Sequence, residues 1–479
     1  MTEVLPTSPA SSTVPQGENE FEFLCALTGV ELGQEHVERI ANWNLSNLDW
    51  SEFLRLAERH GVLPLAARNL IEDARGLPPE IEGTLRSAYD ANLRRSLWFT
   101  AELARIMQHF ERRQLRAVPY KGPLLAQSVY HDVGLRSFSD LDFLISPADF
   151  DRAKQALAEI GYRPSAHFAP AVERFWLRKG YERAFDSAVG PNLVELQWAL
   201  LPHFYAVDLH SDDLRVEDLL ARAVRTVVGG CEVPCLSPED SLLVLCLHAA
   251  KHLWTRLIWL VDIAETLRSQ SQTRTIDYSL VFSRARALGI VRILGVSFWL
   301  AKNVLLAELP EGAEETIAAD PRVPVLGSEF AERLSSGTAY DFESTEYFRL
   351  IMKLRERRGD RWRYLWRLVW TPGAGDVAAV RLPEALFPLY RVVRLLRLTR
   401  KLGKVSKDVQ LRTENWQLPL VCFSVPRRDV WRVNFLLRNT GVPWHRRRRK
   451  ITGLLAGQRD VHELHPDRQS GAGSGFFFA

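Results

Sequence analysis

Cysteine is scarce in this sequence, and the few cysteines are scattered along the chain. Five of the 479 residues are cysteines, an odd number: Cys25, Cys231, Cys235, Cys246 and Cys422. A disulfide framework is typical of short secreted chains with many, evenly paired cysteines. We therefore expect reduced thiols and a cytoplasmic location.

Long apolar segments and a strong excess of one charge are also lacking. The longest apolar candidate, residues 289–309, is interrupted by Arg292 and Lys302, and its periodicity suits a buried or amphipathic helix. Residues 1–19 have neither a basic start nor an apolar stretch, so no targeting segment is expected. A net charge of +4 does not by itself imply a nucleic-acid partner.

What remains is an ordinary globular composition, 46% hydrophobic and 25% charged. Apolar residues at three- and four-residue steps predict helices through most of residues 21–114 and within 149–160, 242–267, 282–306, 349–368 and 383–402. Short runs of strand-forming residues predict strands at 116–120, 140–145, 181–187 and 192–198. Residues 229–234 are expected to form a turn, and residues 308–327 a connector.

The expected strand at 140–145 carries two acidic residues, Asp140 and Asp142. Side chains alternate along a strand, so both carboxylates project from one face, separated by two rises of roughly 3.3 Å. Carboxylates held in this way repel each other unless a positive charge lies between them, and a divalent cation is the usual solution. The alternative is a solvated edge strand whose acids face water.

A Lys-Gly-Pro turn precedes this strand in the sequence. The apolar residues 116–120 lead into Lys121 and Gly122, and Pro123 suits the first position of a helix. A glycine lets the main chain approach a phosphate closely, the helix start offers free N–H groups, and Lys121 adds a cation. A plain strand-to-helix turn is the alternative.

Lys121-Gly122 and the segment LRSFSDLDFL at 135–144 together resemble the core signature of an uncharacterised nucleotidyltransferase family of the DNA polymerase β-type superfamily. The resemblance extends from about His60 to about Arg397 and includes HGVLPL at 60–65, VELQW at 194–198 and HAAKHLW at 248–254. It implies an α+β, mostly helical fold, with a small mixed β-sheet nucleotidyltransferase core flanked by N- and C-terminal helical regions.

The domain organisation predicted with this resemblance has six parts. They are a disordered lead-in at 1–19, an N-terminal helical region at 20–115, the nucleotidyltransferase core at 116–236, a helical region packed on the core at 237–310, a C-terminal helical region at 311–404 and a basic, weakly ordered tail at 405–479.

The resemblance implies transfer of a nucleoside monophosphate from an NTP to an acceptor hydroxyl. Two Mg²⁺ or Mn²⁺ ions would stabilise the attacking and leaving oxygens, held by three carboxylates: Asp140, Asp142 and Glu195. The residues expected to bind the nucleotide phosphates are Lys121, Gly122, Arg136, Ser139 and Lys251. The acceptor stays open between a small molecule, a peptide or protein side chain, and tRNA.

The sequence departs from the pattern of its relatives at two places. The broader superfamily usually has Gly-Ser at the turn, where this chain has Gly122-Pro123. Family members often have an Asp before a His-Trp pair, where this chain has Glu195 and Gln197. These departures motivate an alternative, a catalytically weak nucleotide-binding regulatory protein of the same fold. A helical interaction protein is a further alternative.

Three other patterns allow a structural and a functional interpretation. The spacing of a two-Cys two-His zinc site occurs at Cys231, Cys235, His248 and His252, but the surroundings are too apolar for a free-standing finger. We expect this helix to pack beside the active site, with Trp254, Trp259 and Asp262 in packing and local hydrogen bonds. His60 is expected to act as a cation or a cap at a helix C-terminus, with a catalytic role as the alternative.

A basic stripe recurs at three-residue steps near residue 400, opposite a Val/Leu face: Arg391, Arg394, Arg397, Arg400 and Lys401. We expect a solvated helix face. Attraction of an anionic substrate, or peripheral contact with a membrane surface, is the alternative.

Overall fold

The computed structural model describes residues 18–73, 77–190, 193–205, 207, 214–268, 276–337, 344–380 and 382–399. All of them belong to one compact unit, Met1–Lys404. The predicted lead-in at 1–19 lies almost wholly outside the described residues, and the predicted tail at 405–479 lies entirely outside them. The predicted domain boundaries remain predictions.

A mixed five-stranded sheet carries the segment that the sequence singled out. Its strand order is β1-β2-β5-β4-β3, in which β2 and β5 run parallel and the other neighbours antiparallel. The strands are β1 (Ala117–Tyr120), β2 (Leu141–Ile145), β3 (Arg163–Pro164), β4 (Glu182–Asp186) and β5 (Val194–Gln197). The four strands predicted from the sequence are confirmed.

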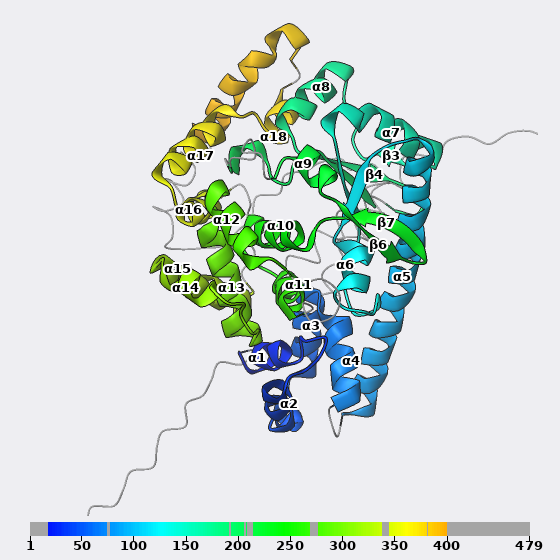
Figure 1. Ribbon diagram of the computed structural model, residues 1–479, viewed down its shortest axis with the longest axis vertical. Helices are drawn as coiled ribbons and strands as arrows, with labels where there is room; N and C mark the ends of the chain where they lie inside the picture. The colour runs from blue at the N-terminus through cyan, green and yellow to red at the C-terminus, as the bar shows by residue number, and fades with distance from the viewer. Residues whose placement is uncertain are drawn as a thin grey trace, which may run out of the picture. The chain divides into compact units, whose positions relative to one another are not determined.

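The two faces of this sheet belong to different hydrophobic cores. Phe143 and Leu196 pack in a core with Phe110 of the long helix α5 (Pro79–Arg112). Tyr120 and Leu144 belong to a larger core built mainly from helices. In Figure 1, α5 runs along one side of the sheet, and α10 (Pro238–Lys251) and α11 (Leu257–Arg268) lie toward the other.

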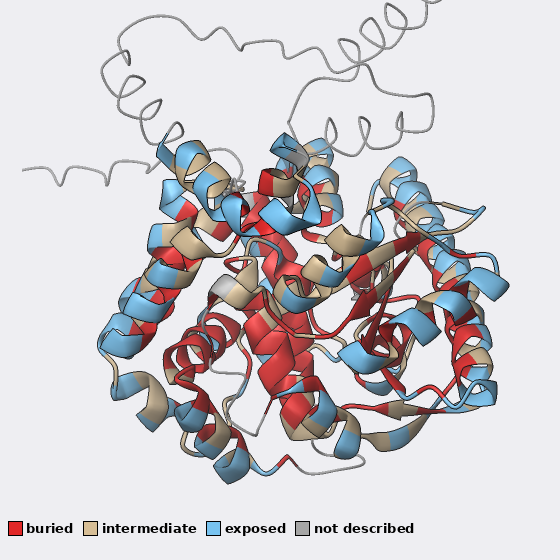
Figure 2. Cartoon of the chain, turned by 90° about the horizontal axis from the view of Figure 1, so that it is seen from above, coloured by how far each residue is buried: buried red, intermediate tan, exposed pale blue. Residues whose placement is uncertain are grey.

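Helices make up most of the described chain, so the predicted α+β, mostly helical fold is confirmed. Figure 2 shows buried residues concentrated in the central helices and the sheet, while outer helices are buried on one side only. Besides those already named, the helices before residue 230 are α1 (Glu18–Ala26), α2 (Gln34–Ala41), α3 (Trp50–His60), α4 (Leu63–Asp73), α6 (Gly122–Ser128), α7 (Phe150–Glu159), α8 (Pro170–Lys179) and α9 (Val216–Ala221).

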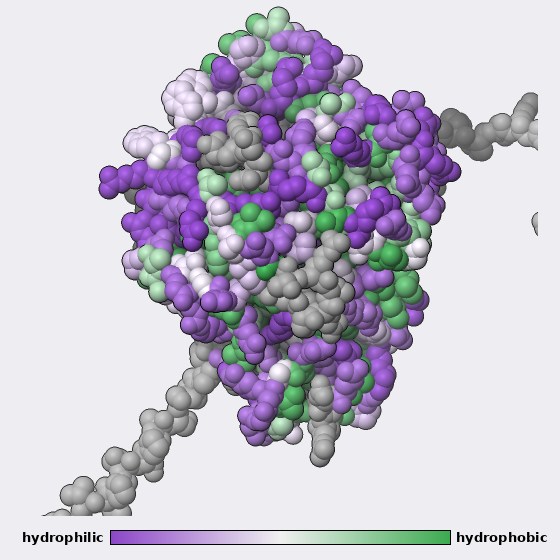
Figure 3. Space-filling model, viewed as in Figure 1, coloured by the Kyte–Doolittle hydropathy of each residue, from purple (hydrophilic) through white to green (hydrophobic). Residues whose placement is uncertain are grey.

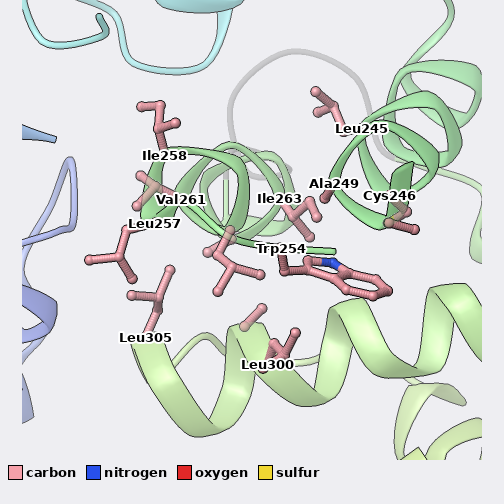
Figure 4. Close-up of a cluster of buried hydrophobic side chains, with 14 of the residues drawn as sticks. Leu245, Cys246, Ala249, Trp254, Leu257, Ile258, Val261, Ile263, Leu300 and Leu305 are labelled. Carbon is pink, nitrogen blue, oxygen red and sulfur yellow. The ribbon is translucent and has the colours of Figure 1, made fainter. Parts of the chain in front are cut away.

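Residues 242–267, for which the sequence left open one helix or a helix pair, form the pair α10 and α11. The hydroxyl of Ser237 accepts a hydrogen bond from the Asp240 N–H and thereby caps the start of α10. Leu253 and Trp254, just after α10, have positive φ angles of 51° and 49°. Trp254 is fully buried against residues of α10, α11 and α13 (Val291–Leu305), as Figure 4 shows, and its indole N–H donates to Ser297.

Several predicted elements differ from the structure. Residues 282–306 do not form one helix, because Gly289, with φ 67°, separates α12 (Tyr278–Leu288) from α13. The expected connector at 308–327 contains α14 (Ala313–Ala318) and the start of α15 (Arg322–Ser335). Prolines favoured the connector prediction, but Pro321 and Pro324 lie at the beginning of α15, where proline is tolerated.

Two more local predictions need correction. The expected turn at 229–234 is part of a hairpin of β6 (Val224–Val228) and β7 (Cys231–Cys235), joined at Gly229-Gly230. The helix predicted at 349–368 is two helices, α16 (Thr345–Leu354) and α17 (Arg358–Trp370), followed by the short α18 (Ala374–Ala379).

The expected solvated basic face is wrong for Arg394 and Arg397. Both form ion pairs with Asp376, whose side chain is buried. A buried carboxylate needs positive partners, and this requirement turns the two guanidinium groups inward. Arg391 is exposed, as expected, but the exposed residues of this segment also include apolar ones, each 44–54% exposed: Leu386, Leu389, Val392 and Leu396. Arg400 and Lys401 lie outside the described residues.

The surface and the cysteines add two observations. No helix in the described ranges is both long enough and apolar enough to cross a membrane. On the face seen in Figure 3, hydrophilic residues predominate and hydrophobic ones form small, separate patches. The four described cysteines are free, which agrees with the expected reduced thiols, whereas the cytoplasmic location stays a prediction.

Candidate active site

The bend between β1 and α6 holds a lysine side chain over the sheet. Lys121 has φ 59° and ψ −146°, a conformation that residues with a side chain rarely adopt, and Gly122 follows with φ 46°. The Lys121 ammonium lies 3.2 Å from Asp142 Oδ2 and 4.6 Å from the centre of the Tyr120 ring. Both side chains of the ion pair are only 9% exposed. The surroundings therefore determine the position of this ammonium closely.

Strand pairing brings the predicted carboxylates together on one face of the sheet. Tyr120 of β1 pairs with Asp142 of β2, and Asp142 pairs with Glu195 of β5. Directly paired residues point to the same face, so the three side chains form one row. Asp140, which immediately precedes β2, is close enough to act electrostatically on Asp142 and on Glu195.

Gln197 joins the two carboxylates that are paired across β2 and β5. Its buried amide group donates to Asp142 Oδ1 at 2.8 Å and to Glu195 Oε2 at 3.1 Å. Its carbonyl oxygen accepts a hydrogen bond from the Tyr120 hydroxyl. Because an amide has two N–H donors, one side chain fixes the spacing of both acids. The sequence identified Gln197 only as a departure from related proteins.

Burial and mutual repulsion make Glu195 and Asp140 reluctant to ionise. Burial, together with the charges of Asp142, Glu182 and Asp140, raises the pKa of Glu195 to about 9. Burial and the charge of Asp142 raise the pKa of Asp140 to about 6, although Lys121 acts in the opposite direction. Added positive charge among the acids would favour their ionised forms. The cluster is therefore suited to bind a cation.

The same residues line a cavity of about 500 Å³, a volume in the range of small-molecule sites. Every residue predicted to bind nucleotide phosphates lies on its wall: Lys121, Gly122, Arg136, Ser139 and Lys251. Their contacts with a nucleotide remain predictions.

Arg136 is engaged differently from the phosphate contact expected of it. The side chain is buried, and its Nε and Nη2 each donate to Asp262 of α11 at 2.8 Å. The Tyr130 hydroxyl donates to the same carboxylate at 2.6 Å. Arg136 thus makes with the buried Asp262 carboxylate the type of bidentate contact that would suit a phosphate. We therefore interpret Arg136 as a residue that fixes the loop before β2 against α11.

Lys251 lies at the end of α10 among three tyrosines. Its ammonium donates to the Tyr181 hydroxyl at 3.0 Å and is 4.0 Å from Glu182. Its main-chain carbonyl accepts hydrogen bonds from Tyr205 at 3.0 Å and from Tyr347 at 2.7 Å. Burial lowers the pKa of Lys251. Because Tyr347 belongs to α16, the C-terminal helices contribute to the cavity wall.

Sequence reasoning missed Tyr181 and Glu182 as cavity residues. Glu182 pairs with Gln197 across β4 and β5, so its side chain faces the same side as the acid cluster. The alternation along 181–187 divides these residues between the two faces of a strand. Which face lines the cavity follows only from the pairing of β4 with β5.

A ready-made metal site is not present in the described part of the chain, where no three His, Cys, Asp or Glu side chains converge closely enough to hold an ion. The zinc interpretation is therefore wrong. The Cys231 thiol lies 3.3 Å from the Gln108 amide, whereas His248 and His252 pack on Trp259 at the cavity wall. This packing matches the preferred expectation for α10.

His60 has a structural role. Its Nδ1 accepts a hydrogen bond from the Leu257 N–H at the start of α11, at 3.3 Å. Burial, with help from Arg59 and Arg256, lowers the pKa of His60 to about 3, so the ring is neutral and is not the cation expected at the end of α3. It is not among the residues that line the cavity, which argues against the catalytic alternative.

Comparison with known proteins agrees with this geometry. The family described as "Uncharacterised nucleotidyltransferase" matches residues 46–305, more than half of the chain, and the chain belongs to this family. Nucleotidyl transfer is therefore its general class of activity, with a nucleotide as substrate. The matched residues include the Lys121 bend, the acid cluster and α10. No curated protein and no solved structure matched the chain.

Proposed function

We propose that this protein transfers a nucleoside monophosphate from an NTP to an acceptor hydroxyl, with divalent cations held by Asp140, Asp142 and Glu195. The observation that carries the proposal is the register that pairs Asp142 with Glu195 on one face, beside Asp140. Placing three acids together is unfavourable for folding, as the raised pKa values of Asp140 and Glu195 indicate. Such a cluster is typical of a functional site.

The donor set fits Mg²⁺ or Mn²⁺, because carboxylate oxygens are preferred ligands of these ions. When bound, two such ions supply charge stabilisation to the attacking and leaving oxygens of an in-line displacement at phosphorus. Lys121 and Gln197 already donate hydrogen bonds to Asp142, which keeps its carboxylate oriented into the cavity. The residue types present therefore suit the ions that this chemistry uses, and binding would draw the three carboxylates closer together than they stand without metal.

Two lysines provide fixed positive charge for the triphosphate. The Lys121 ammonium is held beside Asp142, and that of Lys251 is held beside Tyr181. Negative charge develops on the leaving pyrophosphate, so ammonium groups near it stabilise the transition state more than the bound substrate. Gly122 and Ser139 lie on the same wall and complete the proposed phosphate site.

The acceptor would enter at the β4 end of the cavity. Tyr181 and Glu182 line this end, next to Glu195 on the neighbouring strand. An acceptor hydroxyl there would lie close to Glu195 and Asp142, the two acids paired across β5 and β2. A small molecule, a peptide or protein side chain, and tRNA all remain candidates.

The test uses NTP labelled at the α-phosphate, offered with Mg²⁺ or Mn²⁺ and separate pools of small molecules, proteins and tRNA. Transfer of label, with release of pyrophosphate, is expected from the wild-type protein and should be lost in Asp140→Ala and Asp142→Ala. Asp186→Asn is the control, because this acid lies on β4 outside the cavity lining.

Two other outcomes would favour the alternative functions. Nucleotide binding without pyrophosphate release in any pool would support a regulatory nucleotide-binding protein. An absence of metal-dependent nucleotide binding would support a helical interaction protein.

A further inference from the structure

Three rings meet on the cavity wall beside the acid cluster. The His252 imidazole stacks on the Trp259 indole, with ring centres 4.8 Å apart and planes 27° from parallel. The His248 ring contacts both, with centre distances of 4.8 Å to His252 and 5.6 Å to Trp259. All three residues, here called the ring cluster, line the cavity.

The local fold explains how these rings come together. His248 and His252 lie four residues apart, so they share one face at the end of α10. The positive φ angles of Leu253 and Trp254 turn the chain sharply after that helix. α11 then returns along α10 and brings Trp259 onto the imidazoles.

Both imidazoles are uncharged near neutral pH. Burial lowers the pKa of His248 and of His252 well below the ordinary histidine value, and the nearby charges of Lys121 and Lys251 act in the same direction. The ring cluster therefore presents neutral π surfaces, next to ammonium groups suited to phosphate.

Electrostatic neighbours place the ring cluster beside both lysines of the proposed triphosphate site. The charges of Lys121 and Lys251 act on His248, and the same two charges act on His252. Both lysines line the cavity together with the three rings. The rings thus adjoin the proposed triphosphate site.

We propose that the nucleobase of the NTP stacks on the ring cluster, with Trp259 as the main contact, an inference that rests on the proposed function. A base has the flat π surface that such rings bind, and it is tethered to phosphates that would lie beside Lys121. The strength of stacking depends on the area of the base and not on the hydrogen-bonding groups at its edge. All four NTPs are therefore expected to bind, purine NTPs more tightly than pyrimidine NTPs.

The test compares two ligands of the full-length protein, ATP and inorganic tripolyphosphate, by calorimetric titration with Mn²⁺. Trp259→Ala should weaken ATP binding by roughly 5- to 150-fold, the range that loss of one base–aromatic stack corresponds to, and leave tripolyphosphate binding unchanged. Trp259→Phe, which keeps a π surface and guards against misfolding, should retain most of the ATP affinity. Trp366→Ala, at a tryptophan 66% exposed outside the cavity lining, is the matched control.

Three results would overturn the inference. Unchanged ATP affinity in Trp259→Ala means that the base binds elsewhere. Equal weakening of ATP and tripolyphosphate binding in both Trp259 variants means that the indole supports the fold of the site and does not contact the base. If the wild-type protein binds neither ligand, the proposed function itself fails, and that outcome is distinct from the other two.

Discussion

Lys121 combines a charged side chain with an unfavourable main-chain conformation. Its φ of 59° and ψ of −146° lie in a region that is populated mainly by glycine. The residue remains there although Gly122 follows directly with a positive φ of its own. Strain of this type costs roughly 1–3 kcal/mol and often accompanies function. Here it coincides with the ion pair between Lys121 and Asp142.

Replacing Lys121 separates the strain from the charge. Lys121→Gly and Lys121→Ala both remove the ammonium, but only glycine relieves the backbone. We expect the glycine variant to be more stable than the alanine variant by about 1 kcal/mol or more in urea unfolding. Both should lose affinity for NTP to the same extent. Equal stability of the two variants would show that the backbone at this position carries no strain.

The raised pKa of Glu195 predicts a pH-dependent stability when divalent cations are removed by a chelator. The folded protein keeps the Glu195 proton up to about pH 9, whereas the unfolded chain releases it near the ordinary value of 4.5. The folded state therefore binds more protons in this window, and the free energy of unfolding should fall as pH rises through it.

Glu195→Gln isolates this contribution, because the amide cannot titrate. Urea unfolding at pH 5, 7 and 9 should give a shallower decline in the variant than in the wild-type protein. Identical slopes in the two proteins would contradict the buried, repelled state of this carboxyl group.

At the scale of elements, α13 and α15 approach closely because one of them carries a glycine at the contact. A Cβ atom added at Gly327 of α15 would overlap the indole ring of Trp299 on α13. The two helices belong to the larger core that supports α10 and α11. The distance between α13 and α15 therefore affects where α10 and α11 hold the cavity wall.

Two glycine substitutions test this packing. Gly327→Ala should destabilise the protein by about 1–3 kcal/mol, the range for overpacking. Gly83→Ala, inside α5 with open space around its Cβ position, should be neutral or stabilise by about 0.5–1 kcal/mol. Thermal unfolding of both variants provides the comparison. A Gly327→Ala protein as stable as Gly83→Ala would contradict the close contact.

Local patterns in the sequence predicted the strand elements well, whereas Glu195 joined the predicted site only through the family resemblance, and the roles of the three acids stay a prediction. Alternation along 140–145 and the Lys121 bend are short-range signals, and both are found in the structure. The partner of Arg136 was not predictable, because Asp262 lies 126 residues away and is identified only through tertiary packing. The buried ion pairs of Arg394 and Arg397 depend in the same way on Asp376, which lies outside the segment that carries the two arginines.

At the scale of the whole molecule, the core extends beyond the residues that match the family. Phe23 and Leu24 of α1 precede residue 46 and are fully buried in the larger core. Leu350 and Ile351 of α16 follow residue 305 and are buried in the same core. Tyr347 of α16 also lines the cavity.

A fragment restricted to residues 46–305 should therefore not fold like the longer chain. Removing the flanking helices exposes apolar surface that the core normally buries. We expect the fragment to lack a cooperative thermal transition, whereas residues 18–399 should show one by circular dichroism. A fragment with the same transition temperature as residues 18–399 would show that the flanking helices are independent of the core.

The most direct test of the cation-binding cluster is a Mn²⁺ titration followed by electron paramagnetic resonance in the presence of ATP. Asp142→Asn and Glu195→Gln should each lower the Mn²⁺ affinity by at least about tenfold, since removing a direct ligand costs no less than disturbing its surroundings. Asp186→Asn should bind as the wild-type protein does. Equal Mn²⁺ affinity in all four proteins would contradict the claim that these acids hold the ions together.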